Sequence, residues 1–439
     1  MTTSSREIGR NALLSAAGNL ALPLSTLLTA PMLARGLGVD GRGEFAAATA
    51  PLMLVLTIAM FGLPEALIYL TASARTVSRR GFRNTALLLA ATGVIAALAT
   101  YVSAPVISGG SDSVEQLIRT TSLAVVPSVL IGAPRALASG LNRWGLVNLE
   151  KAITGTLRLT LMFGAFLTDT LTVATATLIV AAAPLLAGIP YLALIRGVRE
   201  APRLENDGPS GKASDLLGYG WRVWLGSVSG ILLSRLSQVL LLPLGGPTAL
   251  GQFAVAMNVS DASLLLNSAI RDVTLTADAA DRADARLTAT ARVSLLLSLF
   301  GGGILIASLP LWFVWLFGED FRGAIPATIV LIAVSVLGVS GSIAGAGLAA
   351  RGHPELRSIS LLIALVANVS TLFLLVPALG ALGAAIATAL GSLIASNLNI
   401  LFMKTRFGLR FRDYYLIRRA DVKGTVRLVN SMMRRGSRS

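Results

Sequence analysis

The chain has no cysteine and a single histidine, His353. Without thiols it can form no disulfide, no thiolate metal site and no cysteine nucleophile, and one imidazole excludes a histidine metal site or a histidine-based triad. Charge is also scarce, because charged residues make up 13% of the 439 residues, against about 25% in a typical soluble domain. Hydrophobic residues account for 54% and the mean hydropathy is +0.73. The composition is therefore that of an integral membrane protein.

The charges that are present are mostly positive, and the net charge is +15. A strongly basic chain can indicate a nucleic-acid-binding protein. Here most of the basic residues lie in short segments between apolar stretches, which favours a membrane topology signal instead. We expect no nucleic-acid partner.

A helix needs about 20 apolar residues to cross the hydrocarbon core of a bilayer. The sequence contains twelve such stretches, which predict an all-α polytopic protein. The predicted spans are 11–34, 45–71, 85–108, 118–141, 149–168, 172–195, 217–243, 249–270, 290–317, 325–350, 358–377 and 382–403.

Lys and Arg are more frequent in the cytoplasmic segments of membrane proteins. With both termini placed in the cytoplasm, 29 of the 37 basic residues fall in cytoplasmic segments and only four in external loops. Those four are Arg35, Arg42, Arg119 and Arg322. The sequence thus predicts a multi-pass membrane protein with both termini in the cytoplasm.

The longest interior connection, residues 196–216, is polar and contains proline and glycine. It predicts a cytoplasmic linker between two six-helix bundles, residues 1–195 and 217–403, which are followed by a basic cytoplasmic tail, 404–439. The tail carries eleven basic residues, and we expect it to lie near anionic headgroups.

Short similar segments recur in the two halves. "GEFAAA" (43–48) resembles "GQFAVA" (251–256) at an offset of 208, and "SGLNRWG" (139–145) resembles "AGLAARG" (346–352) at an offset of 207. Six spans per half is an even number, so the halves share one orientation. A parallel repeat of this kind is common in transporters, with the substrate site near the midplane between the halves.

Several of these segments resemble bacterial oligosaccharide (Wzx-type) flippases of the multidrug, oligosaccharidyl-lipid and polysaccharide exporter superfamily. They are "LARGLGVDGRGEFAAATA", "FGLPEALIYLTA", "LGQFAVAMNVSD" and "VPALGALGAAIATAL". The resemblance implies a V-shaped pair of six-helix bundles around a central cavity. It also implies the transfer of an undecaprenyl-pyrophosphate-linked sugar from the cytoplasmic to the outer leaflet for polysaccharide biosynthesis.

Ionisable residues inside membrane spans normally face a bundle interior or a watery cavity. Arg158, Arg235 and Asp261 lie near mid-depth in their predicted spans. Arg222 is close to the end of its span, where it can reach the interface. Glu65 and Arg135 lie in the cytoplasmic thirds of theirs. Gln238 lies on a polar face beside Arg235, Asn258 shares a face with Asp261, and Asn19 belongs to a comparable polar stripe of the first span.

A guanidinium binds phosphate oxygens bidentately, so arginine suits a pyrophosphate headgroup. We therefore hypothesise that Arg235, Arg158 and Arg135 receive the phosphate, while nearby hydroxyls and amides bind the sugar. A structural alternative remains open, in which Arg235 pairs with Asp261, and Glu65 is favoured as a partner for Arg135. The "GVSGSIAGAG" segment (338–347) is predicted to serve close helix packing through Gly341 and Gly345.

Other functions remain as alternatives. A cation-coupled drug exporter would be expected to carry cavity carboxylates, whereas the spans here contain more arginines than acids. A lipid II flippase is also anion-selective but usually has two further C-terminal spans. We expect no enzyme activity and no cofactor, with coupling to H⁺, Na⁺ or the membrane potential left open through Asp261 or Glu65. A polysaccharide polymerase or glycosyltransferase is a candidate partner.

Overall fold

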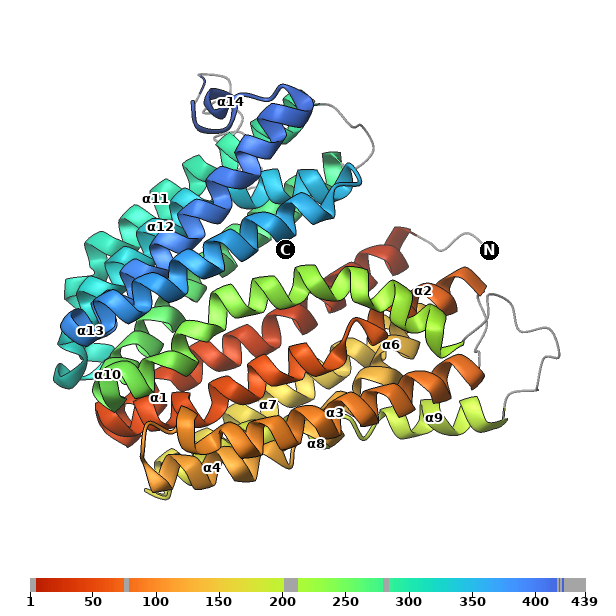
Figure 1. The fold of residues 1–439 in the computed structure, drawn as a ribbon, viewed down its shortest axis with the longest axis horizontal. Coiled ribbons are helices and arrows are strands. Elements are labelled where there is room, and N and C mark those ends of the chain that lie inside the picture. The colour runs from red at the N-terminus through yellow and green to blue at the C-terminus, as the bar shows by residue number, and fades with distance from the viewer. Residues whose placement is uncertain are drawn as a thin grey trace. The chain divides into compact units, whose positions relative to one another are not determined.

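The structure is a computed structural model that describes residues 5–74, 79–200, 212–278 and 284–416, together with Arg418 and Asp421. Side chains are described from residue 21 onward, except those of residues 74, 197–200, 263–278 and 286. Within these ranges every regular element is helical (Figure 1). The chain divides into two compact units, Met1–Ala254 and Val255–Ser439.

The first unit contains nine helices and the first part of a tenth. They are α1 (Ser5–Met60), α2 (Leu63–Ala74), α3 (Arg79–Ile107), α4 (Asp112–Ser122), α5 (Val125–Leu130), α6 (Gly132–Gly140), α7 (Trp144–Leu167), α8 (Val173–Ala187), α9 (Tyr191–Glu200) and α10 (Ala213–Asp278). The second unit contains the end of α10, then α11 (Asp284–Phe317), a 3₁₀ helix η1 (Glu319–Ala324), α12 (Ile325–Ala350), α13 (Pro354–Phe407) and α14 (Phe411–Tyr415).

Seven helical stretches of the described residues are long and apolar enough to cross a membrane. Three of them contain a glycine with positive φ: Gly38 (φ 67°), Gly246 (φ 79°) and Gly380 (φ 52°). Glycine adopts this backbone conformation without the steric penalty of a Cβ atom. Each of these three stretches therefore covers two of the predicted spans. Helix α7 covers the fifth, and the sixth is divided between α8 and the start of α9. The predicted all-α polytopic fold is confirmed.

Two predicted spans are less regular than expected. Span 45–71 is interrupted at Phe61 and Gly62, both with positive φ. Span 118–141 is divided into three pieces, which are the end of α4, the whole of α5 and the whole of α6. Pro127 and Pro134 each occupy the first turn of one of these short helices, where the missing N–H does not remove an intrahelical bond.

The segments around Gly38 and Gly246 show the internal repeat in three dimensions. A Cβ atom on Gly43 would lie 2.0 Å from the carbonyl oxygen of Pro247, and one on Gly251 would lie 2.0 Å from the carbonyl oxygen of Val39. Gly43 and Gly251 are the first residues of the two similar segments, and Val39 and Pro247 differ by the same 208 positions. The repeat therefore also appears as a reciprocal contact between equivalent residues.

The first part of α10 packs against α1 and α2. The indole N–H of Trp224 donates to the carbonyl of Ile58 (2.8 Å), and the rings of Tyr69 and Tyr219 stack with centroids 4.9 Å apart. These contacts explain why the compact first unit extends to Ala254, well beyond the predicted linker. Most of that linker, residues 201–211, lies outside the described residues, so the predicted bundle boundaries at 195 and 217 stay predictions.

In the second unit, α12 and α13 approach closely along their small residues. A Cβ atom on Gly341 would lie 2.2 Å from the Cβ of Ser396, and one on Gly345 would lie 2.6 Å from the side-chain nitrogen of Asn399. Asn399 also donates from Nδ2 to the carbonyl of Gly341 (3.2 Å). The predicted role of Gly341 and Gly345 in close helix packing is confirmed.

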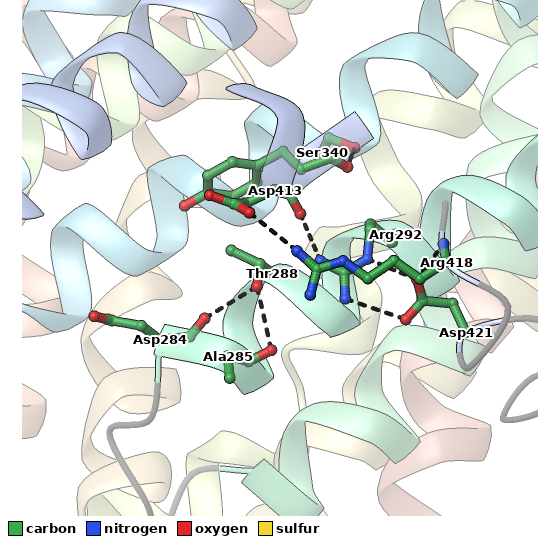
Figure 2. Close-up of polar contacts among 9 residues, drawn as sticks. Asp284, Ala285, Thr288, Arg292, Ser340, Asp413, Arg418 and Asp421 are labelled. Carbon is green, nitrogen blue, oxygen red and sulfur yellow. Dashed lines mark hydrogen bonds and ion pairs between the residues drawn. The ribbon is translucent and has the colours of Figure 1, made fainter. Parts of the chain in front are cut away.

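The described part of the C-terminal tail packs on this unit. Tyr414 of α14 is fully buried among hydrophobic residues of α11, α12 and α13. The side chain of Arg292 on α11 donates to Asp421 from Nε (2.7 Å) and Nη2 (3.2 Å), and to the carbonyl of Asp413 from Nη1 (2.7 Å). Figure 2 shows these contacts. We call Arg292, Asp413, Arg418 and Asp421 the C-terminal clasp.

The clasp refines the expectation that the tail lies at lipid headgroups. Arg292 and Asp421 are 5% and 6% exposed as side chains, so this part of the tail is held by the protein. Residues 422–439, which carry five of the eleven basic residues, lie outside the described residues. For them the headgroup interaction stays a prediction.

Candidate functional site

Arg158 is placed by a close contact between α1 and α7. A Cβ atom on Gly155 would lie 2.8 Å from the carbonyl oxygen of Ala21, so a larger residue would separate the two helices. Arg158 follows Gly155 by three residues, which puts both on one face of α7. Its Nη1 donates to the hydroxyl of Thr26 on α1 (3.5 Å). Arg158 therefore lies on the face of α7 that meets α1.

The polar environment of Arg158 contains no carboxylate partner among the described residues. Its Nε is buried and has no hydrogen-bond partner there, and no ion pair involves its guanidinium. A cation held only by a hydroxyl in a membrane bundle retains donors that can bind an anion.

Arg235 lies on α10, half-buried, within the first unit. Its Nη1 is 3.5 Å from Oε1 of Gln238, one turn further along the helix. Gln238 is 8% exposed and Ser237 is 1% exposed. The structure thus brings together Arg235 and Gln238, two residues predicted for one polar face of this span.

Arg135 has a different partner from the one expected. On α6, its Nε and Nη2 donate to the two carboxylate oxygens of Glu150 on α7 (2.8 and 2.5 Å). The hydroxyl of Tyr191 donates to the same carboxylate (2.9 Å). The expected pairing with Glu65 is wrong, because Glu65 is exposed on α2. The sequence analysis did not consider Glu150 as a partner for Arg135, because Glu150 lies at the start of the predicted span 149–168, next to Lys151.

This network leads us to expect that Arg135 stabilises the bundle instead of binding substrate. The Glu150 side chain is 4% exposed, whereas that of Arg135 is 34% exposed. Arg135→Gln leaves a buried carboxylate without its cation, which typically lowers the free energy of unfolding by about 3–5 kcal/mol. Glu150→Gln should have a smaller effect, because the remaining arginine reaches solvent.

The test is thermal unfolding of the purified variants in detergent. The double variant Arg135→Gln/Glu150→Gln should recover most of the stability and should keep transport activity. A stable but inactive double variant would instead assign Arg135 to substrate binding.

The other predicted site residues are distributed over both units. Asp261 and Asn258 lie half-buried on the part of α10 that belongs to the second unit. Asn19 lies on α1, but its side chain is outside the described residues. Among the described residues, no three His, Asp or Glu side chains are grouped as a metal site would require.

One functional candidate was missed by the sequence analysis. Arg42 was assigned to an external loop, yet it is only 5% exposed. Helix α1 resumes directly after the break at Gly38, so Arg42 lies inside the helical bundle. The guanidinium of Arg42 stands over the ring of Phe45, 5.2 Å from its centroid. Charged residues alternate with glycine or apolar residues over 39–45, and this pattern does not predict that Arg42 is buried.

The helical fold with buried arginines and an internal repeat defines the class as a polytopic membrane transport protein. The model of the polysaccharide biosynthesis protein family matches residues 8–275. The chain belongs to this family, and the resemblance to oligosaccharide flippases found in the sequence is confirmed. The chain matches no curated protein sequence at a significant level.

Several solved structures share this fold. A structure described as the lipid II flippase MurJ in an inward closed conformation matches with a TM-score of 0.74 and 13% identity, over 92% of this chain and 89% of that one. An inward-facing multidrug resistance MATE transporter matches with a TM-score of 0.64 and 18% identity, over 90% and 98%. A transporter from Pyrococcus furiosus, described as having a binding pocket of reverse polarity, matches with a TM-score of 0.55 and 16% identity, over 91% and 95%.

Proposed function

We propose that the chain is a flippase for a polyprenyl-pyrophosphate-linked oligosaccharide. It would move this lipid from the cytoplasmic to the outer leaflet of the bacterial cytoplasmic membrane, with both chain termini in the cytoplasm. The transported sugar would serve the synthesis of a cell-surface polysaccharide. The family match supports a role in polysaccharide biosynthesis, and the fold is shared with a flippase and with exporters.

The observation that carries this proposal is the environment of Arg158. Its guanidinium lies within a membrane bundle, hydrogen-bonded to Thr26 and with a buried Nε that has no partner among the described residues. A cation in such a setting attracts anions more strongly than one at a surface, because the effective dielectric constant is lower. An exporter of cationic compounds would be disfavoured by the same charge.

Arg235 is the second proposed phosphate ligand, with Gln238 beside it as a neutral donor and acceptor for sugar or phosphate oxygens. Transport would proceed by alternating access, in which the two halves rock about the substrate site. The charged head would pass between polar side chains while the polyprenyl tail stays in lipid, so no covalent step is needed. Asp261 is the candidate for coupling to H⁺ or Na⁺.

The test is a mass-spectrometric lipid extract from cells depleted of this protein, compared with a complemented control. We expect a polyprenyl-pyrophosphate oligosaccharide to accumulate only in the depleted cells, and its mass would identify the sugar. Accumulation of lipid II would instead assign the chain to the lipid II flippases. Unchanged lipids together with raised sensitivity to cationic dyes would assign it to the drug exporters.

A further inference from the structure

Arg42 is buried, and Arg158 is half-buried with a buried Nε atom; the two cations lie on neighbouring helices of the first unit. Arg42 follows the Gly38 break of α1, and Arg158 faces α1 from α7. The two side chains are close enough for their positive charges to repel each other. Like charges in a bundle interior are unfavourable unless an opposite charge compensates them.

One hydrophobic cluster joins the parts of α1 and α7 that carry Arg42 and Arg158. Phe45, which carries Arg42 over its ring, packs in one cluster with Met162 of α7. Met162 is fully buried and follows Arg158 by one helical turn. Arg42 thus contacts one member of this cluster, and Arg158 lies on the same face of α7 as another.

Neither guanidinium is neutralised by the described part of the chain. The Nε atoms of Arg42 and Arg158 are both buried and without a hydrogen-bond partner there. The acidic residues beside Arg42 in the sequence do not pair with it: Asp40 is exposed and accepts a hydrogen bond from Thr248 (2.5 Å), and Glu44 forms no ion pair with it. Both guanidinium groups thus retain a buried donor that no carboxylate of the described residues accepts.

We propose that Arg42 and Arg158 together form a binding site for a phosphate group between α1 and α7. Two guanidinium groups offer several donors in fixed planes, which matches the oxygens of a phosphate or pyrophosphate better than a single-atom anion. The site consists only of residues of the first unit and is separate in composition from the Arg235 and Gln238 pair. The proposal adds Arg42 to the phosphate ligand Arg158 and so rests on the proposed function, although the binding chemistry can be tested without transport.

The experiment measures binding of inorganic pyrophosphate to the purified full-length protein by calorimetry, and its effect on thermal unfolding. At about 100 times the dissociation constant we expect the unfolding midpoint to rise by about 3 °C or more. Arg42→Gln and Arg158→Gln should each weaken binding by about tenfold or more, since each removes charge-assisted hydrogen bonds. Arg322→Gln serves as a charge-matched control, because Arg322 is 67% exposed and already paired with Glu319.

A second readout separates this site from a structural role. Without pyrophosphate, Arg42→Gln should be at least as stable as the unmodified protein, because it relieves repulsion between two neighbouring cations. A structural arginine would give the opposite result, a lower unfolding midpoint in the absence of the anion. That result, or pyrophosphate affinity unchanged in both variants, would overturn the proposal.

The source of the phosphate is distinguished with farnesyl pyrophosphate as a second probe. Tighter binding of this lipid than of inorganic pyrophosphate would identify a lipid headgroup as the ligand, and equal binding would identify a free phosphate. The outcome is independent of the depletion experiment. If pyrophosphate binding depends on Arg42 but no lipid accumulates in depleted cells, this site is retained and the flippase function is refuted. If lipid accumulates but binding does not depend on Arg42, the flippase function is retained and this site is refuted.

Discussion

Cells that carry Arg235→Gln in place of the unmodified protein should accumulate the lipid-linked substrate, although the variant is present at a normal level. A guanidinium that binds a phosphate bidentately contributes two charge-assisted hydrogen bonds, and each is worth about 1.5–3 kcal/mol. Their loss corresponds to a reduction in flipping of about 100-fold or more, since about 1.4 kcal/mol is a factor of ten. The lipid extract and the protein level in the membrane fraction measure both quantities.

Arg222→Gln is the matched control, because Arg222 lies on the same helix and is exposed. It should leave the lipid profile unchanged. Full complementation by Arg235→Gln would remove Arg235 from the proposed site.

The structural alternative for Arg235 predicts a different pattern. If its role were to pair with Asp261, then Asp261→Asn would reduce the protein level as much as Arg235→Gln does. The double variant Arg235→Gln/Asp261→Asn would then recover both level and transport. A phosphate ligand predicts that the double variant stays inactive.

The second large effect is expected at the C-terminal clasp. Arg292→Gln leaves the nearly buried carboxylate of Asp421 without its cation, and breaking a buried ion pair in this way costs about 3–5 kcal/mol. Asp421→Asn removes the same charge pair from the other side. By contrast, Arg418→Gln should cost less than about 1 kcal/mol, because the Arg418 side chain is 58% exposed.

Thermal unfolding and trypsin cleavage of the exposed Arg410 measure this difference. Arg292→Gln should lower the unfolding midpoint and accelerate cleavage, whereas Arg418→Gln should do neither. Equal effects of the two variants would show that the tail is not held by the ion pair between Arg292 and Asp421.

The clasp also predicts a dependence on pH. Burial acts to raise the pKa of Asp421, but the hydrogen bonds from Arg292 and from the backbone N–H of Arg418 outweigh it, so this pKa lies below the ordinary aspartate value. A carboxyl with a lowered pKa in the folded state contributes stability that is fully present above its unfolded pKa of about 3.9. The contribution is lost as the pH falls through the folded value. The difference in unfolding midpoint between the unmodified protein and Asp421→Asn should therefore be constant from about pH 5 to 8 and decrease only in stronger acid.

The sequence by itself determined the class of this protein and the order of its membrane spans. Long apolar stretches leave no alternative to helices in a bilayer, because every backbone polar group must be satisfied within the segment. Glycines also carry local information, so the packing of Gly341 and Gly345 could be predicted from their spacing. The family resemblance followed from short segments such as 43–48, whose glycine is required by the close contact with Pro247.

Only the tertiary structure decided which charged groups meet. Glu150 and Arg135 are fifteen residues apart, and Arg292 and Asp421 are 129 apart, and no pattern of spacing links either pair. Arg42 is adjacent to a helix break in the sequence, but its burial depends on the approach of Phe45 to α7. Helix periodicity gives the face on which a residue lies, whereas its partner depends on which faces of distant helices pack together.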